Sequence, residues 1–119
     1  MSPNVVLEKS YQFALRIVRL YKHLSETKKE YVLSKRMLDT GTSVGAFVKA
    51  AQEAESKPDF FHEMNAALKM ATKTEFWLEL LHSGDFLDQR EFDFIHTDCE
   101  EMLKLLKAIT KPTRRIPGN

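Results

Sequence analysis

The sequence of 119 residues predicts an all-α fold, an antiparallel up-down-up-down four-helix bundle formed by a single domain over residues 1–119. Apolar residues recur at spacings of three and four along four long segments, as they do on one face of a helix. Helix start and stop signals separate these segments, and no segment alternates between apolar and polar residues as a half-buried strand does. Short connections between long helices make sequential neighbours run antiparallel.

The first two helices are expected over residues 5–25 and 28–54. Asn4 is a favourable N-cap residue for the first helix, whose apolar face ends at a polar stretch. Thr27 and Glu30 have the spacing of a capping box, in which each side chain accepts a hydrogen bond from the backbone of the other residue. This box predicts that the second helix starts directly after Thr27.

Two glycines lie inside the predicted second helix. Each costs a helix about 1 kcal/mol relative to alanine. Gly45 with Ala46 leaves a shallow surface that the backbone of another helix can approach closely. A break in the helix near Gly41 is the alternative interpretation.

The third helix is expected over residues 58–83. Ser56 can cap its start, and Pro58 is tolerated in the first turn, where its missing N–H needs no partner. Gly84 is a suitable C-terminal cap, because glycine adopts the backbone conformations that end a helix.

The fourth helix is expected over residues 89–111, and Asp88 and Glu91 again have the spacing of a capping box. Pro112 is predicted to stop this helix, because proline cannot donate the backbone hydrogen bond that a helix interior needs. Residues 112–119 then form a basic tail.

Cysteine usage and segment hydropathy indicate a cytoplasmic protein with no membrane partner. Cys99 is the one cysteine, which excludes a disulfide framework and suits a reducing compartment. No apolar run approaches the roughly 20 residues that a membrane helix needs. The first four residues do not begin a signal peptide, because no basic region precedes an apolar one.

Charge is distributed unevenly along the chain. The 18 basic and 17 acidic residues leave a net charge of +1, which gives no global attraction to nucleic acid. By segment, however, residues 1–25 carry +3, residues 85–101 carry −6 and residues 102–119 carry +5. Acids at the start of a helix and bases at its end also complement the helix dipole, so a well-capped last helix is one explanation.

A local anion-binding surface is the other explanation for the basic segments. In that case the basic residues of the first helix and of the C-terminal segment contact nucleic acid. The candidate contacts are Arg16, Arg19, Lys22, Lys111, Arg114 and Arg115.

Several large apolar residues fall outside the predicted core stripes. They either widen the core or form a second apolar face, on which aromatic side chains are suited to anchor self-association. The candidate interface residues are Tyr21, Phe76, Trp77, Leu80 and Phe94.

Catalytic and metal-binding patterns are weak, so we expect no enzyme, no cofactor and no metal centre. A carboxylate lies three residues before a histidine in three pairs, but the di-iron bundles that use such pairs also need inward glutamates on two other helices. Cys99 falls on the core line and is expected to be a small buried hydrophobe; the alternative, a nucleophile, would need His96 to activate it. The three pairs are Asp59 and His62, Glu79 and His82, and Asp93 and His96.

Two runs carry a resemblance to a known family: Ser-Val-Gly-Ala at 43–46, and Glu75 followed by Trp-Leu-Glu-Leu-Leu at 77–81. Over residues 8–112 the chain resembles the small four-helix-bundle proteins encoded in intervening sequences of large-subunit ribosomal RNA genes, which are sometimes labelled ribosomal proteins. It departs from them at Phe47 and Lys49, where relatives usually carry Asn and Glu.

This resemblance implies a ring-like homo-oligomer, a homopentamer, without enzymatic activity. A relative acts as an accessory factor to a diversity-generating reverse transcriptase and uses basic surface to contact nucleic acid. We therefore expect a non-catalytic homo-oligomer that binds RNA or a ribonucleoprotein. The alternative is a protein–protein interaction scaffold without nucleic-acid binding.

Overall fold

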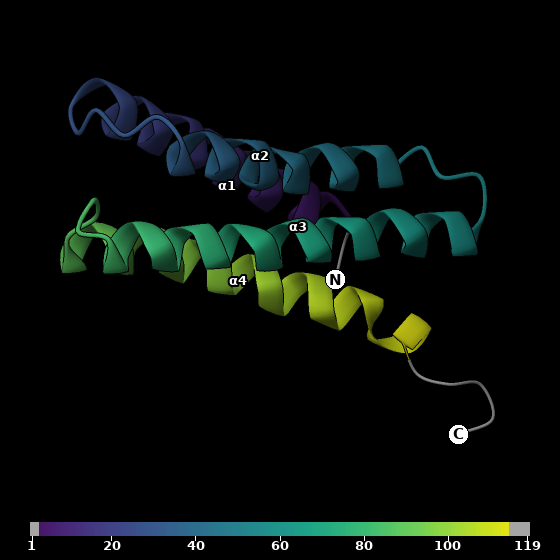
Figure 1. The fold of residues 1–119 in the computed structure, drawn as a ribbon. Coiled ribbons are helices and arrows are strands. Elements are labelled where there is room, and N and C mark those ends of the chain that lie inside the picture. The colour runs from purple at the N-terminus through teal and green to yellow at the C-terminus, as the bar shows by residue number, and fades with distance from the viewer. Residues whose placement is uncertain (1–2, 115–119) are drawn as a thin grey trace.

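A computed structural model describes residues 3–114, and within this range the chain is all-α. Figure 1 shows four long helices joined by short connections. No strand occurs among the described residues, which confirms the predicted fold class. The helices are α1 (Pro3–Glu26), α2 (Leu33–Ala51), α3 (Lys57–Ser83) and α4 (Gln89–Arg114).

Ion pairs between α1 and α4 show that these helices run antiparallel. The Lys9 ammonium group of α1 lies 3.0 Å from the Glu101 carboxylate of α4. Further along α1, His23 lies 3.0 Å from Glu91, which precedes Glu101 in α4. Figure 1 shows connections at alternating ends of the bundle, so successive helices run up, down, up and down.

Each helix packs against two neighbours, in the closed order α1–α2–α3–α4–α1. The core lies between them and is filled by aliphatic and methionine side chains, because each helix contributes one apolar stripe. The largest fully buried side chains include Ile17, Leu24, Met37, Met64, Leu78, Leu81, Met102 and Leu106.

The start of α2 differs from the prediction. The backbone N–H of Thr27 donates to the carbonyl of His23, so Thr27 is bonded to the end of α1 and does not start α2. The chain then turns through Lys29 at φ 59°. The helix predicted over 28–54 therefore extends only over Leu33–Ala51. The predicted box was wrong because the turn places Glu30 in front of the helix, where it caps α2 instead.

Glu30 caps α2 with its carboxylate. Its two oxygens accept hydrogen bonds from the backbone N–H groups of Val32, Leu33 and Ser34, at 3.1, 3.0 and 2.6 Å. The Ser34 hydroxyl in turn donates to the Glu30 carbonyl at 2.7 Å. These bonds satisfy N–H groups that a helix start leaves without intrahelical partners, and they explain how a carboxylate only 9% exposed is tolerated.

The starts of α3 and α4 follow their sequence signals. The Ser56 hydroxyl accepts from the backbone N–H of Asp59 at 3.2 Å, and Gly84 caps the end of α3. At α4 the predicted box forms in both directions: the Asp88 N–H donates to the Glu91 carboxylate at 2.9 Å, and the Glu91 N–H donates to that of Asp88 at 2.7 Å.

The end of α4 also differs from the prediction. The helix runs to Arg114, past Pro112 and three residues beyond the expected end at 111. A proline in the final turn removes one backbone hydrogen bond near an end whose carbonyls already lack intrahelical partners, so the helical backbone continues past it.

Gly41 and Gly45 lie where α1 crosses α2, and α2 continues through both without a break. A Cβ atom at Gly41 would lie 2.8 Å from Cγ2 of Ile17. At Gly45 it would lie 3.3 Å from the backbone oxygen of Ser10. The predicted close approach of another helix is therefore confirmed.

None of the four helices, as far as the structure describes them, combines the length and the apolar character that crossing a membrane requires.

Replacing Gly41 by alanine is expected to lower the free energy of unfolding by up to about 2 kcal/mol, measured by urea unfolding. Crowding against Ile17 costs about 1–3 kcal/mol, and the better helix propensity of alanine returns about 1 kcal/mol. Gly45→Ala, with its wider spacing, should destabilise less. The double variant Ile17→Ala, Gly41→Ala should lose less free energy of unfolding than the two single variants lose in sum, because removing Ile17 also removes the crowding. Losses that add strictly would contradict the crowding.

Replacing Glu30 by glutamine is expected to destabilise the protein by about 1–2 kcal/mol at neutral pH. Burial alone raises the pKa of Glu30, but the hydrogen bonds from Ser34, Leu33 and Val32 outweigh it and lower the pKa overall. The ionised carboxylate thus contributes stability that is fully present above the ordinary pKa of glutamate. This contribution is lost as the pH falls through the lowered pKa of the folded state.

Urea unfolding between neutral and acidic pH measures this effect. The difference in stability between wild type and Glu30→Gln should shrink as the pH falls, because a protonated carboxyl resembles the amide. Glu53→Gln, at an exposed position, is the control and should show no difference. A difference for Glu30→Gln that stays constant with pH would argue against the cap.

Candidate functional site

Not all of the basic residues of α1 that are predicted to contact nucleic acid have an unpaired charge. The Arg16 guanidinium lies 2.8 Å from the Asp98 carboxylate and 5.7 Å from the centre of the Phe94 ring. Its charge is therefore compensated by α4. Arg19 and Lys22 are exposed and form no ion pair with any residue that the structure describes.

The structure does not bring the two predicted basic groups together. Arg16 lies beside Asp98, whereas Lys111 is thirteen residues further along α4. At a rise of 1.5 Å per residue this separation is about 20 Å, half the length of the 26-residue helix. Arg115 lies outside the described residues, and only the backbone of Arg114 is described.

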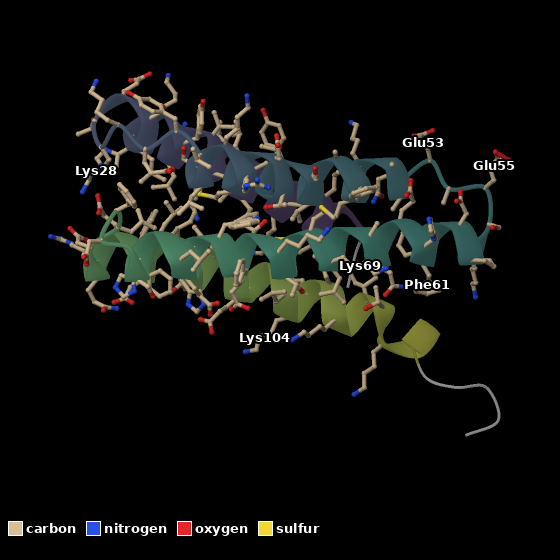
Figure 2. All side chains as sticks on the ribbon, in the orientation of Figure 1. Lys28, Glu53, Glu55, Phe61, Lys69 and Lys104 are labelled. Carbon is tan, nitrogen blue, oxygen red and sulfur yellow. The ribbon has the colours of Figure 1, made fainter. Side chains whose placement is uncertain are left out.

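Lysines on α3 and α4 form a second basic surface, which we call the lysine surface. The spacing of three and four between the lysines of α4 places them on one helix face, a signal that the sequence already contained. The Cys99 thiol of α4 reaches the Ala71 carbonyl of α3, so in this antiparallel pair Lys69 comes level with residue 101, three residues before Lys104; Figure 2 labels both lysines. The lysine surface consists of the exposed residues Lys69, Lys73, Lys104, Lys107 and Lys111.

The predicted interface residues divide between two places on the bundle. Phe76, Leu80 and Phe94 are exposed, whereas Tyr21 and Trp77 are half-buried and pack against the core. Phe76 lines a groove between α2 and α3, and Phe94 lines a seam between α1 and α4, so they form two separate surfaces rather than one.

The first surface, the Trp77 groove, lies between α2 and α3. The rings of Phe76 and Trp77 meet edge to face with their centres 5.1 Å apart, and the Arg36 guanidinium lies 5.6 Å from the Trp77 ring. Phe76 is 52% exposed despite these contacts. The groove is lined by Arg36, Asp39, Thr40, Thr72, Lys73, Phe76 and Trp77.

The second surface, the Phe94 seam, lies between α1 and α4. Phe94 is 65% exposed and stands among apolar and charged neighbours. Because the helices pack in the order α1–α2–α3–α4, the α1–α4 seam lies across the bundle from the α2–α3 seam. The seam is lined by Arg16, Arg19, Leu20, His23, Glu91, Phe94 and Ile95.

Five further large exposed apolar residues of the described chain were not predicted as interface residues, among them Tyr11, Tyr31 and Val32. Tyr11 lies on α1, and Tyr31 and Val32 lie in the connection between α1 and α2. The last two were missed because the sequence placed them inside the second helix, where the true boundary at Leu33 leaves them in a turn.

Cys99 is a buried thiol and not an activated nucleophile. Its sulfur is fully buried and donates to the Ala71 carbonyl at 3.5 Å. Burial, followed by the negative charges of Glu75, Glu100 and others, raises the pKa of Cys99 to about 12. The thiol therefore stays protonated at neutral pH, as expected for a small core residue.

The carboxylate–histidine pairs of the sequence do not act as pairs. His82 stacks on the Phe92 ring at 4.4 Å, and Phe92 stacks on His96 at 4.7 Å. His96 instead contacts Glu75 of the neighbouring helix, with its Nε2 atom 3.0 Å from the carboxylate. Glu79 lies beside both, so a cluster forms across two helices that patterns within one helix could not reveal.

Comparisons with known proteins agree with this architecture. Residues 3–108 match the model of a family described as 23S rRNA-intervening sequence protein. A protein of unknown function from the S23 ribosomal protein family of Bacteroides thetaiotaomicron VPI-5482 is 46% identical, with a TM-score of 0.91. The match covers 93% of this chain and 99% of that one. No curated protein matches the chain. Since the family model spans nearly the whole chain, the chain belongs to the 23S rRNA-intervening sequence protein family.

Proposed function

We propose that this protein is a non-catalytic, cytoplasmic homo-oligomer that binds RNA or a ribonucleoprotein. The observation that carries the proposal is the pair of exposed aromatic surfaces on opposite seams of one bundle. Two different surfaces on one chain join copies head to tail, and such interfaces form a ring when the rotation between neighbouring copies closes. The number of copies, five, rests on the resemblance to the family.

In the proposed ring, the Phe94 seam of one copy contacts the Trp77 groove of the next. Phe94 and Phe76 supply the aromatic anchors, which are the residue types that dominate interface energies. The Arg36 guanidinium at the rim of the groove offers a cation to an incoming ring.

RNA binding is proposed to use Lys69, Lys104, Lys107 and Lys111 of the lysine surface, together with Lys22 of α1. Lys73 and Arg19 line the Trp77 groove and the Phe94 seam, which the proposed ring covers. Lysines bind phosphate without reading sequence, so recognition is of backbone charge. Repetition around a ring multiplies weak single contacts into a stable one. The ribosomal family name of the Bacteroides protein favours RNA over other polyanions.

Light scattering after size-exclusion chromatography tests the assembly. The wild type is expected to have a mass of about five times the 13.8 kDa chain, about 69 kDa. Phe94→Ala and Phe76→Ala should each give monomers, because each removes one anchor. Tyr11→Ala should leave the mass unchanged, because Tyr11 is as exposed to solvent as Phe94 but lies outside both surfaces.

Mixing the two interface variants distinguishes a head-to-tail contact from a symmetric one. Each variant retains the surface that the other lacks, so the mixture should form dimers while each variant alone stays monomeric. A wild type that is monomeric at micromolar concentration would overturn the ring and favour the protein–protein scaffold.

A salt series with single-stranded RNA of mixed sequence tests the lysine surface. Each lysine that neutralises a phosphate of single-stranded RNA contributes about 0.7 to the slope of log K against log salt concentration. The double variant Lys104→Ala, Lys107→Ala should therefore have a slope shallower by about 1.4 than that of the wild type. The control variant Lys35→Ala, Lys57→Ala removes the same charge elsewhere and should keep the wild-type slope. Absence of binding, or binding indifferent to salt, would leave the scaffold function.

A further inference from the structure

Three metal-ligating side chains converge where α3 packs on α4. Glu75 and Glu79 are four residues apart on α3 and therefore share one helix face. His96 of α4 points its Nε2 atom at Glu75 across the seam, 3.0 Å away. One ligand atom from each residue lies within 4.8 Å of the other two.

This set matches the preferences of a zinc-type ion. Zinc binds imidazole nitrogen and carboxylate oxygen at about 2.0–2.2 Å in tetrahedral geometry, which places donor atoms about 3.4 Å apart. Glutamate side chains on a helix surface reach such separations by rotation about their own bonds. An imidazole ligand favours zinc and its transition-metal neighbours over magnesium or calcium, which prefer oxygen ligands.

The surroundings of His96 provide a second, separate indication. Its other ring nitrogen, Nδ1, faces the Glu100 carboxylate at 3.6 Å. Histidines that bind a metal characteristically direct their second nitrogen to a carboxylate, which orients the ring. Stacking on Phe92 at an interplanar angle of 16° further fixes the plane of the ring.

The cluster also carries excess negative charge. Among the residues that the structure describes, His96 is the one ion-pair partner of both Glu75 and Glu100. Glu79 forms no ion pair within this part of the chain. Their combined field contributes to the raised pKa of the neighbouring Cys99. Both Glu75 and Glu79 belong to the sequence run at 75–81, and neither assembly nor RNA binding has a use for their carboxylates.

We propose that Glu75, Glu79 and His96 bind one divalent transition-metal ion of the zinc type. Glu100 orients His96 without touching the ion, and water takes the remaining position. Cys99 is not a ligand, because its thiol is engaged with the Ala71 carbonyl. The proposal does not rest on the proposed assembly or on RNA binding, although Glu75 and Glu100 share a groove with Lys104 and Lys107 of the lysine surface.

Isothermal titration calorimetry with Zn²⁺ tests this site. The full chain is purified without chelator, then stripped of bound metal, and then titrated. We expect one ion per chain, bound at least tenfold more weakly by Glu79→Gln and by His96→Gln. Glu100→Gln should weaken binding by about tenfold, as changes to the partner of a ligating histidine do. Circular dichroism verifies that each variant folds; Glu79 is exposed, so its replacement leaves the core intact.

Matched controls separate this site from incidental binding. Glu53→Gln and His62→Gln change the same residue types at exposed positions and should bind Zn²⁺ like the wild type. Cys99→Ala should also retain binding, and Co²⁺ bound in place of Zn²⁺ should show no thiolate charge-transfer band. Wild-type affinity in Glu79→Gln and His96→Gln, or no stoichiometric binding at all, would reduce the cluster to a structural ion pair.

Discussion

The contact between Ile17 and Gly41 sets the geometry on which the bundle depends. With no side chain at Gly41, the branched carbons of Ile17 rest close to the backbone of α2, and the two helices pack closely. This close approach fixes where α1 lies relative to α2, and therefore where it meets α4 on its other side. The ion pairs of Lys9, Arg16 and His23 then close the ring of helices along that seam.

Local signals were reliable at the starts of α3 and α4, because they depend on residues only a few positions apart. The capping box of Asp88 and Glu91 and the cap at Ser56 each join residues three apart. The start of α2 was missed because two caps competed for the same few residues. Glu30 serves three N–H groups from a turn at Lys29, and nothing in the spacing of Thr27 and Glu30 excluded the simpler box.

Surface properties were harder to predict, because they depend on contacts between helices. Arg16 has the same appearance in the sequence as Arg19, yet Asp98 neutralises only Arg16 among the described contacts. Glu75 and His96 are separated by a whole helical hairpin, so only the register of α3 on α4 brings them together. Residue types could thus indicate that a basic or an aromatic surface exists, whereas only the packed structure shows which residues form it.

Glu91 links two helix ends that are far apart in the chain. One of its oxygens accepts the Asp88 N–H that starts α4, and the other lies 3.0 Å from His23 in the last turns of α1. If the end of α1 or the start of α4 frays, Glu91 loses one of its two partners, and the other helix end is then held less firmly. The two ends should therefore open as one cooperative unit, and their amide protons should exchange with solvent at matching rates although they lie on different helices.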